Sequence, residues 1–239
     1  MMGRQARTLV VWVALCWASL PGVGITARGD VVIGNFGAAL GVGTNFGPGT
    51  STMFKAAGFM MGNRDYVLDG VTLTMDFAGG GEATVEIWTG VSAPQSVALA
   101  LDGPPQTGAG DFTFTPTSEF RLLRGQSYWV YVRAASGSSG NFLWQGTSPP
   151  RIPAGPARHI AYIFNSNPSN TYNRFQVEGT LVPICHGDCN RDRVLDIFDV
   201  VCFQDAFLRR DPLADCTGDG RYDIFDFLCF QDSFLNGCP

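Results

Sequence analysis

Residues 28–182 alternate apolar and polar side chains in short runs, separated by Gly, Pro or Asn. A period of two places the apolar side chains on one face of a β-strand, whereas no run sustains the 3.6-residue period of an amphipathic helix. About eight to ten such strands predict an antiparallel β-sandwich, jelly-roll-like, with one buried face per sheet. The clearest candidate strands are 71–77, 83–87, 112–114, 128–132, 142–144, 160–164 and 175–177.

The pattern changes after residue 187, where an acidic stretch followed by apolar residues at helical spacing occurs twice. Asp188-Cys-Asn-Arg-Asp-Arg-Val-Leu-Asp-Ile-Phe-Asp199 aligns without a gap with Asp215-Cys-Thr-Gly-Asp-Gly-Arg-Tyr-Asp-Ile-Phe-Asp226, at an offset of 27 (215 − 188). A duplication predicts one supersecondary unit used twice, with neither copy able to bury its apolar face alone. We expect part of the core from Val201, Phe203, Phe207, Leu208, Leu228, Phe230, Phe234 and Leu235.

The carboxylates of each copy stand at positions 1, 5, 9 and 12 of a twelve-residue loop. That is the ligand spacing of a calcium loop, in which position 7 adds a backbone carbonyl. An acidic surface turn is the alternative, but two copies in register favour two Ca²⁺ ions. The predicted ligands are Asp188, Asn190, Asp192, Val194, Asp196 and Asp199, then Asp215, Thr217, Asp219, Arg221, Asp223 and Asp226.

These repeats resemble a type I dockerin, and the ending Gly237-Cys238 is similar to the GC-type form; the resemblance covers residues 187–239. It implies a small α, EF-hand-like module that binds a cohesin-like receptor in a calcium-dependent way. This chain departs from the pattern at Arg193, where loop position 6 normally holds Gly, and at Thr217, which offers a hydroxyl at position 3. We therefore expect the two loops to differ in affinity.

The resemblance also implies receptor contacts at positions 10, 11, 17 and 18 of each copy. The Ile and Phe of these positions can instead pack inward; we favour inward packing for the Ile and leave the Phe open. The implied contacts are Ile197, Phe198, Gln204, Asp205, Ile224, Phe225, Gln231 and Asp232.

Cysteine usage predicts a disulfide framework, because six cysteines lie within the last 55 residues of a chain that we expect to be exported. They are Cys185, Cys189, Cys202, Cys216, Cys229 and Cys238. The dockerin resemblance implies a Cys185–Cys238 bridge, because the ends of such modules lie close together. The other four occupy equivalent positions in the two copies and should pair pseudo-symmetrically. Zinc is the rival, but no Cys-x-x-Cys spacing occurs.

Residues 1–27 predict a secretory signal peptide, with Arg4 and Arg7 before an apolar run that is too short to span a bilayer. Cleavage after Gly24 or Ala27 fits the small residues there. We expect a secreted protein associated with the cell surface, without a transmembrane segment in the mature chain. The net charge of −5 and the absence of a basic patch argue against a nucleic-acid partner.

Residues 28–182 resemble the choice-of-anchor R domain, a secreted domain joined to various C-terminal sorting devices. The resemblance rests on Asn35-Phe36-Gly37, Tyr66-Val-Leu-Asp-Gly-Val-Thr-Leu73, Val85-Glu-Ile-Trp88 and Leu123-Arg-Gly-Gln-Ser-Tyr-Trp-Val130. It implies an architecture and a location but no reaction. Residues 183–186 then form a short linker to the dockerin-like module at 187–239.

Catalytic motifs are sparse in residues 28–182, which contain a single histidine, His159, no cysteine and no Gly-x-Ser-x-Gly elbow. We expect no enzymatic activity, although folding can bring together two carboxylates as in a glycoside hydrolase. The alternative function is polysaccharide binding on exposed aromatic side chains. The candidates are Trp88, Trp129 and Tyr131, with Trp144 less favoured, and packing of Trp129 under a loop is the competing interpretation.

Overall fold

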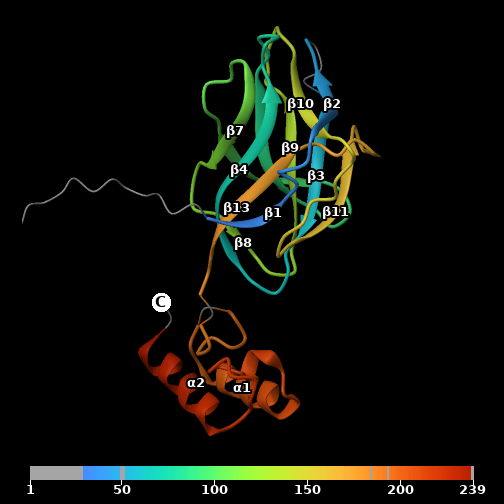
Figure 1. The fold of residues 1–239 in the computed structure, drawn as a ribbon. Coiled ribbons are helices and arrows are strands. Elements are labelled where there is room, and N and C mark those ends of the chain that lie inside the picture. The colour runs from blue at the N-terminus through green and yellow to red at the C-terminus, as the bar shows by residue number, and fades with distance from the viewer. Residues whose placement is uncertain (1–28, 49–51, 184, 193, 238–239) are drawn as a thin grey trace, which may run out of the picture.

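The computed structural model describes residues 29–48, 52–183, 185–192 and 194–237. The predicted signal peptide at 1–27 lies outside these residues. The described residues form a mainly antiparallel β-sheet domain, followed by a small C-terminal region with two helices (Figure 1). Within this described part, no helix is long and apolar enough to cross a bilayer.

Thirteen strands form one strongly curled sheet in the described residues. Ten of them follow one hydrogen-bonded path in the order β1-β13-β4-β7-β6-β5-β9-β3-β11-β12, while β10 pairs with β2 and β4, and β8 pairs with β4. The strands are β1 (Asp30–Gly34), β2 (Leu40–Phe46), β3 (Phe54–Met60), β4 (Tyr66–Asp76), β5 (Ala83–Thr89), β6 (Ser96–Asp102), β7 (Ala109–Pro116), β8 (Arg121–Leu122), β9 (Ser127–Ala134), β10 (Phe142–Thr147), β11 (Arg158–Phe164), β12 (Asn167–Pro168) and β13 (Phe175–Leu181).

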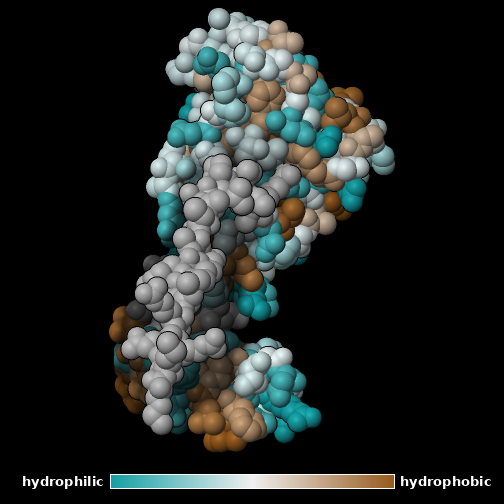
Figure 2. Space-filling view, turned by 60° about the vertical axis from the view of Figure 1, so that its left-hand side comes forward, coloured by the Kyte–Doolittle hydropathy of each residue, from teal (hydrophilic) through white to brown (hydrophobic). Residues whose placement is uncertain are grey.

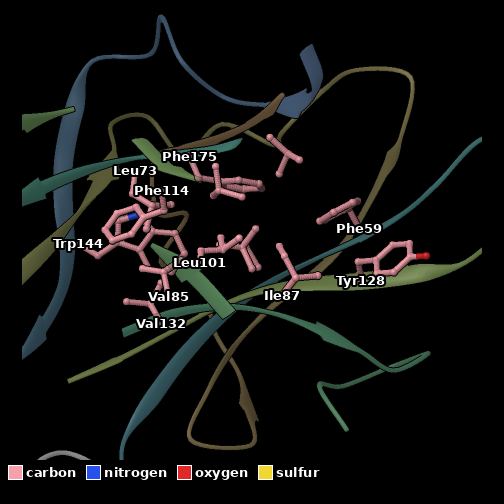
Figure 3. Packing of buried hydrophobic residues seen from close by; sticks show 14 of the residues in the cluster. Phe59, Leu73, Val85, Ile87, Leu101, Phe114, Tyr128, Val132, Trp144 and Phe175 are labelled. Carbon is pink, nitrogen blue, oxygen red and sulfur yellow. The ribbon is translucent and has the colours of Figure 1, made fainter. Parts of the chain in front are cut away.

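The main core lies inside the curl, where apolar residues from both halves of the sheet meet (Figure 3). The alternation seen in the sequence produces it: Val71, Leu73 and Met75 of β4 point inward and are fully buried. Strands β1, β2, β3, β6, β8 and β12 are not among the clearest candidates from the sequence. In β2 and β3, glycine and alanine interrupt the apolar pattern. The antiparallel character of the sheet is confirmed, whereas central strands such as β3 and β9 are buried on both faces.

Strand β9 departs from the predicted one-sided burial, because both of its faces are covered. Tyr128, Val130 and Val132 pack in the main core. Trp129 and Tyr131 on the opposite face form a second, smaller cluster with Ile163 of β11 and with Ala56 of β3. The Trp129 indole N–H donates to the Gly90 carbonyl at 2.7 Å, so the loop after β5 closes over this face.

The C-terminal region contains α1 (Ile197–Arg209), a 3-10 turn (Pro212–Ala214) and α2 (Ile224–Asn236). Its core is aromatic: the rings of Phe203 and Phe230 stack with their centroids 4.3 Å apart. Each helix begins with a capping box formed by two aspartates three positions apart, at loop positions 9 and 12. The fixed spacing of the repeat thus sets both helix starts.

Candidate functional site

The first acidic loop is tied to the start of α1 by Asp199, whose carboxylate is fully buried. The backbone N–H of Asn190 donates to one oxygen of Asp199 at 3.1 Å, and that of Asp196 donates to the other at 3.0 Å. Asp192 accepts from the Val194 N–H at 2.8 Å and from the Asn190 side-chain amide at 2.9 Å. These bonds tie loop positions 3 and 9 to position 12, and position 5 to positions 3 and 7.

The second loop repeats this arrangement around Asp226, which is also fully buried. Its carboxylate accepts from the Thr217 backbone and hydroxyl, each at 3.1 Å, and from the Asp223 N–H at 3.0 Å. Burial alone raises the pKa of the Asp226 carboxyl, but the hydrogen bonds from Asp223 and Thr217 outweigh it, so that its pKa lies below the usual range. Asp226 is therefore held as a carboxylate at neutral pH.

A carboxylate oxygen in the second loop remains without a protein partner. Asp215 accepts the Gly220 N–H on Oδ2 at 2.9 Å, while its Oδ1 is buried and makes no hydrogen bond in the described part of the chain. A buried anionic oxygen of this kind is costly unless a cation or water satisfies it. The oxygen-rich donor set around it is the kind that Ca²⁺ prefers.

The backbone of the loops explains part of their sequence. Gly218 and Gly220, at positions 4 and 6 of the second loop, have φ values of 72° and 76°. Position 4 of the first loop is Arg191, which adopts a φ of 62° without the freedom of glycine. The sequence predicted a difference at position 6, but Arg193 lies outside the described residues. The demand for positive φ at position 4 was missed.

The predicted ligands are brought into two compact loops but not into a finished cage. Among the described residues, no group of three His, Cys, Asp or Glu side chains stands ready to hold a metal ion. The loops do bring position 12 against positions 3 and 9, through Asp199 with Asn190 and Asp196. The remaining carboxylates have to move together before they can share one cation.

The disulfides follow the duplication. Cys189 pairs with Cys202 and Cys216 with Cys229, each across 13 residues and with Cα atoms 5.8 Å apart. Each bridge joins loop position 2 to the following helix within one copy, so the predicted pseudo-symmetric pairing is confirmed. The proposed partner of Cys185, Cys238, lies outside the described residues, and that bridge stays a prediction.

The predicted partner-binding residues lie on the surface of the two helices. Ile197 and Ile224 are 65% and 64% exposed, so the expectation that they pack inward is wrong. They occupy the first position of each helix, which projects from the capping box instead of facing the aromatic core. Phe198 and Phe225 are 66% and 63% exposed. The polar contacts predicted at Gln204, Asp205, Gln231 and Asp232 are exposed as well.

The apolar surface is larger than the sequence suggested. Of the apolar residues expected to close the core, Phe203 and Phe230 are buried, whereas others point to solvent. We call the exposed set the paired apolar surface, because each member in α1 has an equivalent 27 positions later in α2; hydrophobic side chains of this region are visible in Figure 2. Its members are Ile197, Phe198, Val201, Leu208, Ile224, Phe225, Leu228 and Leu235.

The aromatic residues proposed for polysaccharide binding are mostly unable to contact a ligand. Trp129 and Trp144 are fully buried, Trp144 within the main core. Trp88 and Tyr131 stack on each other with centroids 4.3 Å apart, and the Trp88 N–H donates to Glu86 at 2.8 Å. The competing interpretation, in which Trp129 packs under a loop, is confirmed. The ring face that Trp88 and Tyr131 turn to each other is unavailable to a sugar.

No model of a known protein family matches the chain, and no curated protein matches its sequence. The functional argument therefore depends on the two loops, the bridges and the paired apolar surface.

Proposed function

We propose that this chain is an exported attachment protein whose C-terminal region is a dockerin-like, EF-hand-like module that binds two Ca²⁺ ions and a cohesin-like receptor. The observation that carries the proposal is the repeat itself. Two loop–helix units, 27 residues apart, each bury a position-12 aspartate and each expose the same apolar pair beside it.

The calcium proposal follows from the donors that the loops supply. In the first loop the ion would be held by Asp188, Asn190, Asp192, Asp196, Asp199 and the Val194 carbonyl; in the second by Asp215, Thr217, Asp219, Asp223, Asp226 and the Arg221 carbonyl. Bound Ca²⁺ supplies positive charge that offsets the repulsion among the aspartates. The buried, unpartnered Oδ1 of Asp215 supports this fit. Because the carboxylates must converge, ion binding and ordering of the loops are coupled.

The paired apolar surface supports a protein partner. Exposed aromatic and aliphatic side chains are the usual centre of a binding interface, and a polar rim surrounds them. Here Gln204 and Asp205 lie on the same helix as Phe198, and Gln231 and Asp232 lie on the same helix as Phe225. Because the surface occurs twice, the same partner can bind through the first copy or through the second. The module would then dock in two different orientations.

In this proposal, the β-sheet domain is attached through the C-terminal module and takes no part in receptor binding. We infer that its curled sheet is a jelly-roll-like sandwich of the choice-of-anchor R type, without a catalytic role in attachment, and that the chain is secreted and held at the cell surface. The two disulfides favour an oxidising compartment.

Titration calorimetry of the full oxidised chain tests the calcium proposal. We expect two Ca²⁺ ions per chain in the wild type, one after either Asp188→Ala or Asp215→Ala, and none after both changes. Asp102→Ala removes an exposed carboxylate from β6 and should leave the stoichiometry at two. Absence of heat from the metal-free wild type at millimolar calcium would refute the proposal.

A further inference from the structure

A buried lysine and a half-buried serine meet at one edge of the β-sheet domain. Lys55 of β3 is fully buried, and its Nζ lies 2.5 Å from the Oγ of Ser169, which follows β12. Lys55 shares the inward face of β3 with Ala57 and Phe59 of the main core. Among the described residues no carboxylate forms an ion pair with this amine. The contact thus joins a buried amine to a hydroxyl on a half-buried residue.

The surroundings of Lys55 favour its neutral form. The amine lies 5.4 Å from the ring centroid of Tyr162, whose hydroxyl is already engaged with Asn173 and Asn35. Burial lowers the pKa of Lys55 from 10.5 to about 8. Burial also raises the pKa of Tyr162 and lowers that of His159, so both are neutral where Lys55 titrates. A neutral amine has a lone pair that accepts the proton of a serine hydroxyl.

Ser169 is held in a defined position by the backbone. Its N–H donates to the Tyr162 carbonyl at 2.8 Å, and the Thr171 N–H donates to its Oγ at 3.3 Å. The next residue, Asn170, is exposed, and its backbone N–H makes no hydrogen bond to the described part of the chain. The N–H of the residue after a nucleophile is a common donor to the oxyanion of acyl transfer.

We propose that Ser169 is a nucleophile activated by Lys55, and that it accepts an acyl group from small esters approaching from solvent. The Oγ proton passes to Lys55 Nζ while Oγ bonds to the ester carbonyl carbon. The carbon–oxygen bond to the leaving group breaks, and the leaving alkoxide takes the proton from Nζ. Ser169 is left as an ester, which water hydrolyses by the same route, with Lys55 accepting the proton of the water.

Labelling of the full chain with p-nitrophenyl acetate and with a fluorophosphonate, read by mass spectrometry of peptides, tests this proposal. We expect a single adduct on Ser169, forming at a rate that rises with pH and levels off above about 8. Lys55→Met should slow the labelling roughly 10²-fold, the usual contribution of a general base. Ser169→Ala should remove the adduct.

Ser166→Ala is the matched control. Ser166 is exposed in the same β11–β12 hairpin and should not be labelled, so this change should leave the adduct on Ser169 unaltered. Circular dichroism establishes that each variant is folded, and the pH profile of the wild type decides the matter without any variant. Equal labelling of Ser169 in folded Lys55→Met, no adduct on Ser169 in the wild type, or a rate that does not level off would overturn the proposal.

Discussion

At the scale of single residues, Lys55 is the most unusual side chain of the β-sheet domain. A lysine buried without a carboxylate partner is costly, because the charged form loses its hydration. Its folded pKa of about 8 lies below the value of 10.5 that applies when it is exposed. The unfolded chain therefore binds more protons between these two values, and stability rises as the pH increases through this window.

We expect Lys55→Met to stabilise the β-sheet domain by about 1–3 kcal/mol at pH 7, because it removes the cost of keeping an amine in the core. The rise in stability between pH 8 and pH 10.5 should disappear in the variant. Denaturant unfolding measured across this pH range checks both statements. A variant that is less stable than the wild type at pH 7 would show that the Lys55–Ser169 contact outweighs the burial cost.

At the scale of elements, the two helices show that one repeat can build both a core and a surface. Phe203 and Phe230 stack at the centre, while Phe198 and Phe225 begin the same helices and face solvent. The helical period separates the two sets, because Phe198 and Phe203 are five residues apart and lie on different faces. The cap at Asp196 fixes where the helix starts, and so fixes which face each residue takes.

Phe203→Ala should therefore destabilise the C-terminal region by about 3–5 kcal/mol, through the lost stack and the cavity that it leaves. Phe198→Ala, the matched change in the same helix, should stay within about 0.5 kcal/mol. Thermal unfolding followed by near-ultraviolet circular dichroism distinguishes the two. Similar losses from both changes would mean that Phe198 is packed and not part of an open surface.

The sequence predicted the elements better than their surroundings. Alternation in β4 identified its buried face correctly, since inward residues there are consistently apolar. It did not foresee the second layer over Trp129, because a periodic pattern does not tell whether a loop covers the outer face. The spacing of the repeat predicted two equivalent loops and a pseudo-symmetric pairing of four cysteines, but not that each bridge closes within one copy. Lys55 and Ser169 were not foreseen, because a contact across 114 residues leaves no local pattern.

At the scale of the whole molecule, the sheet domain and the helical region each have a core of their own, and the helical region carries the paired apolar surface that we propose binds a partner. Two equivalent contact sets should make the loss of one tolerable and the loss of both decisive. This expectation depends on the proposed receptor, and it concerns binding and not folding.

We expect Phe198→Ala and Phe225→Ala each to retain calcium-dependent capture of a purified cohesin-like receptor. The double variant should lose at least about tenfold in affinity, because truncating central aromatic contacts typically costs more than 1 kcal/mol each. Surface plasmon resonance with calcium and with chelator measures this. Val97→Ala, an exposed apolar change in β6, is the control. Full binding by the double variant would place the receptor elsewhere on the molecule.

Each disulfide closes within its own copy, Cys189 to Cys202 and Cys216 to Cys229. A protease cut in the segment between α1 and α2 would therefore yield two separately cross-linked fragments. Their association would then depend on the non-covalent contacts of the shared core, in which Phe203 stacks on Phe230, unless the predicted Cys185–Cys238 bridge ties the chain ends together. Under denaturing, non-reducing conditions, the nicked protein should therefore stay in one piece only if this third bridge has formed.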